Sequence, residues 1–149
     1  MSDTLADLTS DRFTVESGSR VLVQVPQPAA SQVLQAILAV EPLQWGDYDQ
    51  VAFTTKAGTQ QFRVLPQARN AATDQAVTVA CVELQVFVPR RGQALEPVLR
   101  AIYDAHPYEE PVIQILAAQR SCHRRGADEA NPNRFWNQPP ANWVPEWHR

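Results

Sequence analysis

The chain has 149 residues, 44% of them apolar and 19% charged, which excludes a fully disordered or fibrous protein. Its 13 basic and 16 acidic residues give a net charge of 13 − 16 = −3, so it lacks the positive charge of a general nucleic-acid binder. Without an apolar signal-peptide core or a run near the ~18 residues of a membrane span, it is expected to be soluble, cytoplasmic and without a membrane partner.

The composition changes twice along the chain, which predicts three parts. Residues 1–19 are polar and form an expected N-terminal tail, extended only around Phe13–Val15. Residues 20–118 contain nearly all the periodic apolar pattern and form the predicted domain. Residues 119–149 contain four Pro, four Asn and three Trp, and form a predicted Pro/Trp-rich C-terminal arm.

The first half of the domain predicts one helix and three strands. Alternating valines predict a strand over 21–25. Apolar residues at helical spacing then predict a helix over 28–40, which a following proline must end. Residues 48–55 and 60–65 predict two strands, joined as a hairpin around Lys56-Ala57-Gly58.

The second half repeats the pattern of a strand, a helix and a strand. Residues 76–88 are rich in valine and predict a long, half-buried strand. A second helix follows, ended by His106-Pro107, and residues 111–116 predict the last strand. The apolar face of this helix consists of Leu95, Val98, Leu99, Ile102 and Tyr103.

We interpret the order of these elements as β-α-β-β-α-β, which predicts an α+β fold of the ferredoxin-like type. In that fold an antiparallel sheet has both helices on one face. The long strand 76–88 has apolar residues at both alternate sets of positions, so its second face is not expected to meet water. Our hypothesis is that another subunit or the Trp-rich arm covers this face.

The densest polar cluster is Ala-His-Pro-Tyr-Glu-Glu-Pro at residues 105–111. Imidazole and carboxylate groups bind zinc, copper, nickel or manganese, so His106, Glu109 and Glu110 are the candidate ligands of a divalent metal ion. The alternative is structural: the prolines direct the chain out of the helix, Tyr108 packs its ring, and the carboxylates bind backbone donors. From the residues alone we favour the structural interpretation.

The cysteines and the glycines of the sequence give no pattern that is typical of a catalytic or nucleotide-binding site. Cys122-His123 has no second Cys/His pair nearby, and Cys81 lies in a strand pattern where it is expected to be a small buried apolar residue. Five dispersed glycines form no nucleotide-binding motif.

Three tryptophans in the arm allow two interpretations. The arm can wrap over its own or a neighbouring subunit, which we favour because tryptophan buries a large area. Alternatively it lines a ligand site, for which the candidate residues are Trp136, Arg124 as an anion-binding group, and Tyr108.

The run Tyr-Asp-Ala-His-Pro-Tyr-Glu-Glu-Pro at residues 103–111 resembles the signature of the Nif-three-like family. There it closes an inserted CutA/PII-like domain, and CutA-type proteins, implicated in divalent cation tolerance, contain a similar turn. Trp45-Gly46-Asp47-Tyr48 and the spacing Phe53…Gly58…Phe62 resemble the middle of that inserted domain. The resemblance covers about residues 20 to 118 and implies a ferredoxin-like fold and a trimer with clefts between subunits.

The resemblance also has limits. The family's dinuclear metal ligands lie in halves outside this sequence, so it implies no hydrolase or cyclohydrolase activity. Residues 66–71 replace the family's glycine-rich segment. We therefore predict an oligomeric binding or regulatory module for a divalent metal ion or small ligand. Two alternatives remain open: a small enzyme with His106 as base and Glu110 as orienting group in an inter-subunit cleft, and an interaction protein using the Trp-rich arm.

Overall fold

The computed structural model of the protein describes residues 8 and 10–137. The chain divides into two compact units, residues 16–120 and residues 1–15 with 121–149, and we describe each by itself. In chain order the elements are β1 (Phe13–Pro26), the 3-10 turn η2 (Gln27–Ala29), α1 (Ala30–Leu38), β2 (Phe53–Thr54), β3 (Gly58–Phe62), β4 (Val77–Pro89), α2 (Leu95–Ala105), β5 (Val112–His123) and the 3-10 turn η3 (Phe135–Asn137).

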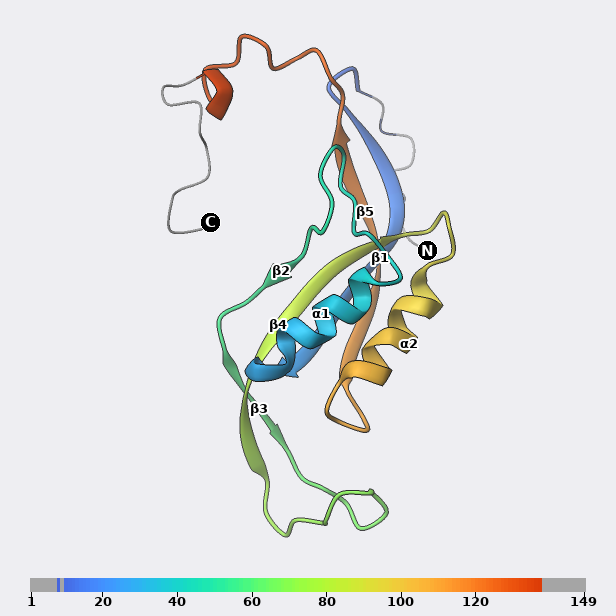
Figure 1. Ribbon diagram of the computed structural model, residues 1–149, viewed down its shortest axis with the longest axis vertical. Coiled ribbons are helices and arrows are strands. Elements are labelled where there is room, and N and C mark those ends of the chain that lie inside the picture. The colour runs from blue at the N-terminus through green and yellow to red at the C-terminus, as the bar shows by residue number, and fades with distance from the viewer. Residues whose placement is uncertain (1–7, 9, 138–149) are drawn as a thin grey trace. The chain divides into compact units, whose positions relative to one another are not determined.

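The strands form one antiparallel sheet in the order β2-β4-β1-β5, with β3 also paired to β4. Both helices lie on one face of this sheet, side by side (Figure 1). This arrangement confirms the predicted ferredoxin-like α+β fold. None of the helices among the described residues is long and apolar enough to cross a membrane.

The core lies between the helices and the two central strands. β1 and β4 pair in a register that places Val21 opposite Val86 and Val25 opposite Val82. Because successive side chains of a strand point to opposite faces of the sheet, these valines all lie on the face that the helices cover. The buried cluster consists of Val21, Val23, Val25, Val33, Ile37, Leu43, Val82, Leu84, Val86, Val88, Val98 and Ile102.

The helices form where the apolar spacing predicts them, with two differences at their edges. α1 ends at Leu38 rather than at residue 40, and Tyr103 of α2 is 50% exposed although it belongs to the predicted apolar face. α2 ends at Ala105 because His106 has an extended backbone, with ψ of 138°, as expected for a residue before proline.

The predicted hairpin between residues 48–55 and 60–65 is wrong. β2 and β3 do not pair with each other, because both pair antiparallel with β4 and follow one another along it. Thr54 lies opposite Leu84 and Gly58 opposite Cys81, so three residues, 55–57, face two residues of β4. This extra residue is a β-bulge, which interrupts one edge strand of the sheet.

The long strands extend beyond the predicted domain of residues 20–118. β1 begins at Phe13, within the predicted tail, and β5 continues to His123, within the predicted arm. Within the predicted tail, Gly18 and Ser19 pair with Pro89 and Val88 of β4 through the main chain, and main-chain pairing does not require apolar side chains. The division into 1–19, 20–118 and 119–149 otherwise stays a prediction.

Candidate functional site

The histidine at the end of α2 is held by two main-chain groups. His106 is buried, its Nε2 donates to the carbonyl oxygen of Gln24 at 2.7 Å, and its Nδ1 accepts from the N–H of Tyr108 at 3.0 Å. Because a carbonyl oxygen only accepts and Nδ1 accepts from an N–H, these two contacts place the ring hydrogen on Nε2. Both nitrogens are therefore engaged in holding the turn to β1.

The neighbouring carboxylates lie apart from that ring. Glu109 accepts hydrogen bonds from the main-chain N–H groups of Arg69 at 3.0 Å and Asn70 at 3.4 Å, which anchors the loop between β3 and β4. Glu110 is exposed. Within the described residues no group of three His, Cys, Asp or Glu side chains could hold a metal ion. Metal binding by His106, Glu109 and Glu110 stays a prediction.

Tyr108 packs its ring against Phe62, with the centroids 5.6 Å apart in an edge-on arrangement. Its hydroxyl is buried beside the thiol of Cys81, yet no described atom completes a hydrogen bond of ordinary geometry with it. Burial, with a smaller effect from Cys81, raises the pKa of Tyr108, and burial also raises the pKa of Cys81. At neutral pH both groups are protonated, and Cys81 is the buried residue that its strand pattern predicts.

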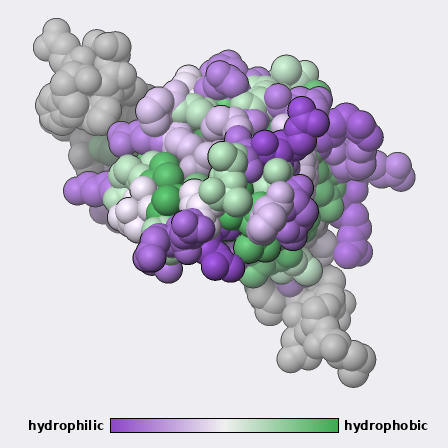
Figure 2. All heavy atoms as spheres, turned by 90° about the horizontal axis from the view of Figure 1, so that it is seen from below, coloured by the Kyte–Doolittle hydropathy of each residue, from purple (hydrophilic) through white to green (hydrophobic). Residues whose placement is uncertain are grey.

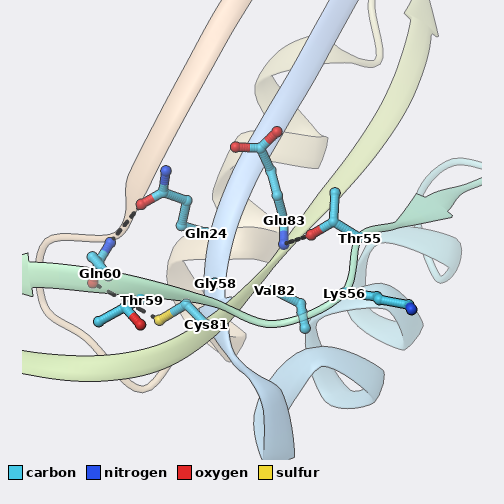
Figure 3. Close-up of a pocket in the computed structure, with 9 residues that line it drawn as sticks. All are labelled: Gln24, Thr55, Lys56, Gly58, Thr59, Gln60, Cys81, Val82 and Glu83. Atoms are coloured by element: carbon cyan, nitrogen blue, oxygen red, sulfur yellow. Dashed lines mark hydrogen bonds between the residues drawn. The ribbon is translucent and has the colours of Figure 1, made fainter.

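A cleft of about 220 Å³ opens at the bulge, on the side of β4 where β2 gives way to β3 (Figure 3). Thr55 shapes it: its main-chain N–H donates to the carbonyl oxygen of Glu83 at 3.1 Å, and its Oγ1 accepts from the N–H of Glu83 at 2.9 Å. A side-chain oxygen thus takes the place of a main-chain carbonyl oxygen as the acceptor at the bulge. The lining consists of Gln24, Thr55, Lys56, Gly58, Thr59, Gln60, Cys81, Val82 and Glu83.

Two amide side chains order one end of the cleft. The Nε2 of Gln60 donates to the Oε1 of Gln24 at 2.9 Å, and the Cys81 Sγ lies 4.0 Å from the Oε1 of Gln60, as a weak donor. Cys81 therefore connects the cleft to the buried Tyr108 hydroxyl.

The cleft has one side chain of each charge. Glu83 is half-buried, and its Oε1 accepts from the Nε2 of Gln85 at 2.9 Å. Lys56, the single lysine of the chain, is exposed and points away from Gln24, Gln60 and Glu83 in Figure 3. Neither charge has an ion-pair partner in the part of the chain that the structure describes.

The other two predicted ligand residues belong to the second unit. Arg124 is exposed and its N–H donates to the carbonyl oxygen of Arg12, while Trp136 lies in η3 with 55% exposure. Tyr108 belongs to residues 16–120. A shared ligand site of Tyr108, Arg124 and Trp136 therefore stays a prediction, and Trp143 and Trp147 lie outside the described residues.

Within that second unit Asp128 joins two arginines. Its carboxylate accepts from Arg12 at 2.9 and 3.0 Å and pairs with Arg134 at 2.9 Å. Loss of hydration opposes ionisation, but the Asn131 amide and the two guanidinium groups outweigh it and lower the pKa of Asp128. The carboxylate is thus charged at neutral pH, and it organises the turn that precedes η3.

A buried arginine lies away from the cleft. Arg120 of β5 is 8% exposed, and its guanidinium carbon lies 4.3 Å from the ring centroid of Phe87 and 5.0 Å from that of Trp45. Its Nε donates to the Oε1 of Glu16 at 2.7 Å and its NH1 to the carbonyl oxygen of Gln44 at 2.9 Å. Its donors are engaged within the fold, which makes it a structural cation that attaches the loop after α1 to the sheet.

No protein-family model matches the chain, and no curated protein matches it. Among solved structures, a Bacillus cereus protein related to NIF3 is similar, with a TM-score of 0.59 and 26% identity over 72% of this chain. The match covers 27% of that protein, so this chain spans about a quarter of its length.

Two CutA structures also match. CutA1 from Oryza sativa has a TM-score of 0.50 and 16% identity over 70% of this chain and 82% of that protein. CutA from Synechococcus elongatus has a TM-score of 0.50 and 14% identity, covering 76% and 83%. At such identities the likeness concerns the fold alone, and it agrees with the CutA-like sheet described above.

Proposed function

We propose that this protein is a self-associating module that binds a small polar ligand in the cleft at the bulge. The observation that supports this is the lining itself: side-chain amides, hydroxyl groups and two opposite charges border one concave site. Such polar groups fix the orientation of a ligand. The CutA-like fold agrees with the predicted binding or regulatory role.

The cleft's chemistry favours binding over catalysis. Its one thiol, Cys81, has a pKa raised by burial, so it is a thiol rather than a reactive thiolate at neutral pH. The buried His106 is not among the lining residues, and its nitrogens are held by main-chain groups. The lining therefore offers recognition groups, with a carboxylate at Glu83 but without an activated nucleophile beside it.

Filling the cleft should abolish binding without unfolding the protein. A side chain at Gly58 would meet open space, because nothing lies within 4 Å of the position of its Cβ. We expect Gly58→Phe to occupy the cleft, to change the melting temperature little, and to remove binding of small polar compounds. Ligand-observed NMR with matched amine, acid and amide probes measures this.

The matched control is Thr54→Phe, which adds the same ring to exposed β2 outside the lining. It should bind the probes as the unmodified protein does. If no probe binds the unmodified protein, or if Gly58→Phe binds as well as the control, the cleft is not a ligand site.

Self-association is the second part of the proposal, and the edge strand β5 supports it. Val112, Ile115 and Leu116 are 40–49% exposed on this strand, and exposed apolar side chains are visible among polar ones in Figure 2. Ile113 packs against the core, so alternation places Leu116 on the face without helices. An exposed edge with apolar residues favours pairing with another chain. We propose a homo-oligomer, with a trimer favoured.

A charge on this face should disrupt the assembly. We expect Leu116→Lys to reduce the mass measured by sedimentation velocity to that of a monomer, because burial of an unpaired ammonium is costly. Leu65→Lys, at a loop residue that is 44% exposed, is the control and should leave the mass unchanged. A monomeric unmodified protein would contradict this part of the proposal.

A further inference from the structure

We infer that the ligand of the cleft carries an ammonium group, which the carboxylate of Glu83 recognises. This inference rests on the proposed function, because it names the chemistry of the ligand that the cleft would take. It concerns residues that the family signature does not include.

The position of Glu83 carries the inference. Glu83 is half-buried and has no cationic partner among the described residues, although carboxylates drawn into a fold are ordinarily paired. Glu83 has one side-chain donor, the Gln85 amide, which contacts Oε1. Its Oε2 accepts no hydrogen bond within the described part of the chain. A cationic donor in the cleft would complete it.

The surroundings of Glu83 hold it in place. Its main chain is bound in both directions by Thr55, through the N–H and the hydroxyl oxygen. The Gln85 amide that contacts Oε1 in turn accepts from Arg20 NH2 at 3.1 Å. The carboxylate is thus oriented before a ligand arrives, which reduces the entropy that binding loses.

The lysine of the same cleft is the weaker recognition group. Lys56 is exposed, and its flexible stem directs the ammonium away from the other polar lining residues (Figure 3). Water screens an exposed charge of this kind, so it contributes little to the binding of an anion. As a second positive charge that borders the cleft, Lys56 would weakly repel a cationic ligand rather than help to bind it.

The volume limits the size of the ligand. At about 220 Å³ the cleft is smaller than the roughly 300–1,000 Å³ of pockets that enclose drug-sized molecules. Its amides and hydroxyl groups favour a compact polar molecule. The class is therefore a small primary amine rather than a nucleotide or a peptide.

Three probes of nearly equal size separate the possibilities: propylammonium, propionate and propionamide. NMR titration of the full-length protein should show tightest binding for propylammonium. Glu83→Gln keeps the shape and removes the charge, so it should weaken this binding about 10-fold or more, since a hydrogen bond to a charged group is worth about 1.5–3 kcal/mol. Lys56→Gln should leave it unchanged or strengthen it.

The outcomes separate this inference from the proposed function. If propionate binds tightest and Lys56→Gln abolishes its binding, or if the three probes bind equally and Glu83→Gln has no effect, the ammonium inference is overturned while the cleft remains a ligand site. Binding that Gly58→Phe does not affect overturns both. Melting temperatures of the two charge variants should match the unmodified protein, which confirms that a lost signal reflects recognition.

Discussion

Replacing Arg120 with alanine should lower the free energy of unfolding by about 3 kcal/mol. Removing one partner of a buried ion pair typically costs about 3–5 kcal/mol, and the low end applies because the side chain of Glu16 retains 24% exposure. The substitution also leaves the carbonyl oxygen of Gln44 without its donor and removes the cation that lies over the rings of Trp45 and Phe87. Urea denaturation monitored by tryptophan fluorescence and circular dichroism measures the change.

The matched control is Arg100→Ala. Arg100 also pairs with a glutamate, Glu96, but the side chains are 71% and 67% exposed, so water screens the pair and the stability should change little. Arg120→Lys should recover only part of the stability, because an ammonium lacks the planar guanidinium group that contacts both rings. Equal effects of the alanine substitutions at Arg120 and Arg100 would show that Arg120 is not a structural cation.

Replacing His106 with phenylalanine should cost about 2–4 kcal/mol. The ring volume is kept, but the carbonyl oxygen of Gln24 and the N–H of Tyr108 both lose their partners. Each buried main-chain group left without a hydrogen bond costs on the order of 1–3 kcal/mol. Thermal and urea denaturation provide the measurement, and Tyr103→Phe, at a residue that is 50% exposed, is the control, with an expected change within about 0.5 kcal/mol.

The same substitution tests the metal prediction. If the turn is structural, zinc titration by calorimetry gives the same result for the unmodified protein and for His106→Phe, while the stability falls. Zinc binding that is lost in both His106→Phe and Glu109→Ala would instead support a metal ion at this turn. The main-chain contacts of both side chains favour the structural interpretation.

The end of α2 is an example of a structural feature that neighbouring residues predict. His106 precedes a proline, so its backbone must be extended, and the helix ends there whatever the surroundings. The valines of β1 and β4 likewise alternate in a way that suits a strand with one face on a core. Such patterns of apolar residues and prolines depend only on residues close together in the sequence. The order of the helices and strands, and with it the fold class, could therefore be predicted.

The segment between β2 and β3 is an example of a feature that neighbouring residues do not predict. Lys56-Ala57-Gly58 has the composition of a turn, yet the chain there continues along β4 with a bulge, because β4 is long enough to pair with both segments. The partner of a strand is a non-local choice that periodicity does not contain. The error at this hairpin concealed the cleft, since the cleft exists only where the bulge separates the strands.

The amino-acid sequence by itself determined the apolar periods, the helix stop at His106-Pro107, and the low positive charge. These depend on residue type and spacing along the chain. Only the tertiary structure decided that Gln24, Gln60 and Glu83 meet at one cleft, that His106 contacts the main chain of Gln24, and that Arg120 contacts two aromatic rings. These partners are distant in sequence, so the packing of separate strands, turns and loops brings them within contact distance.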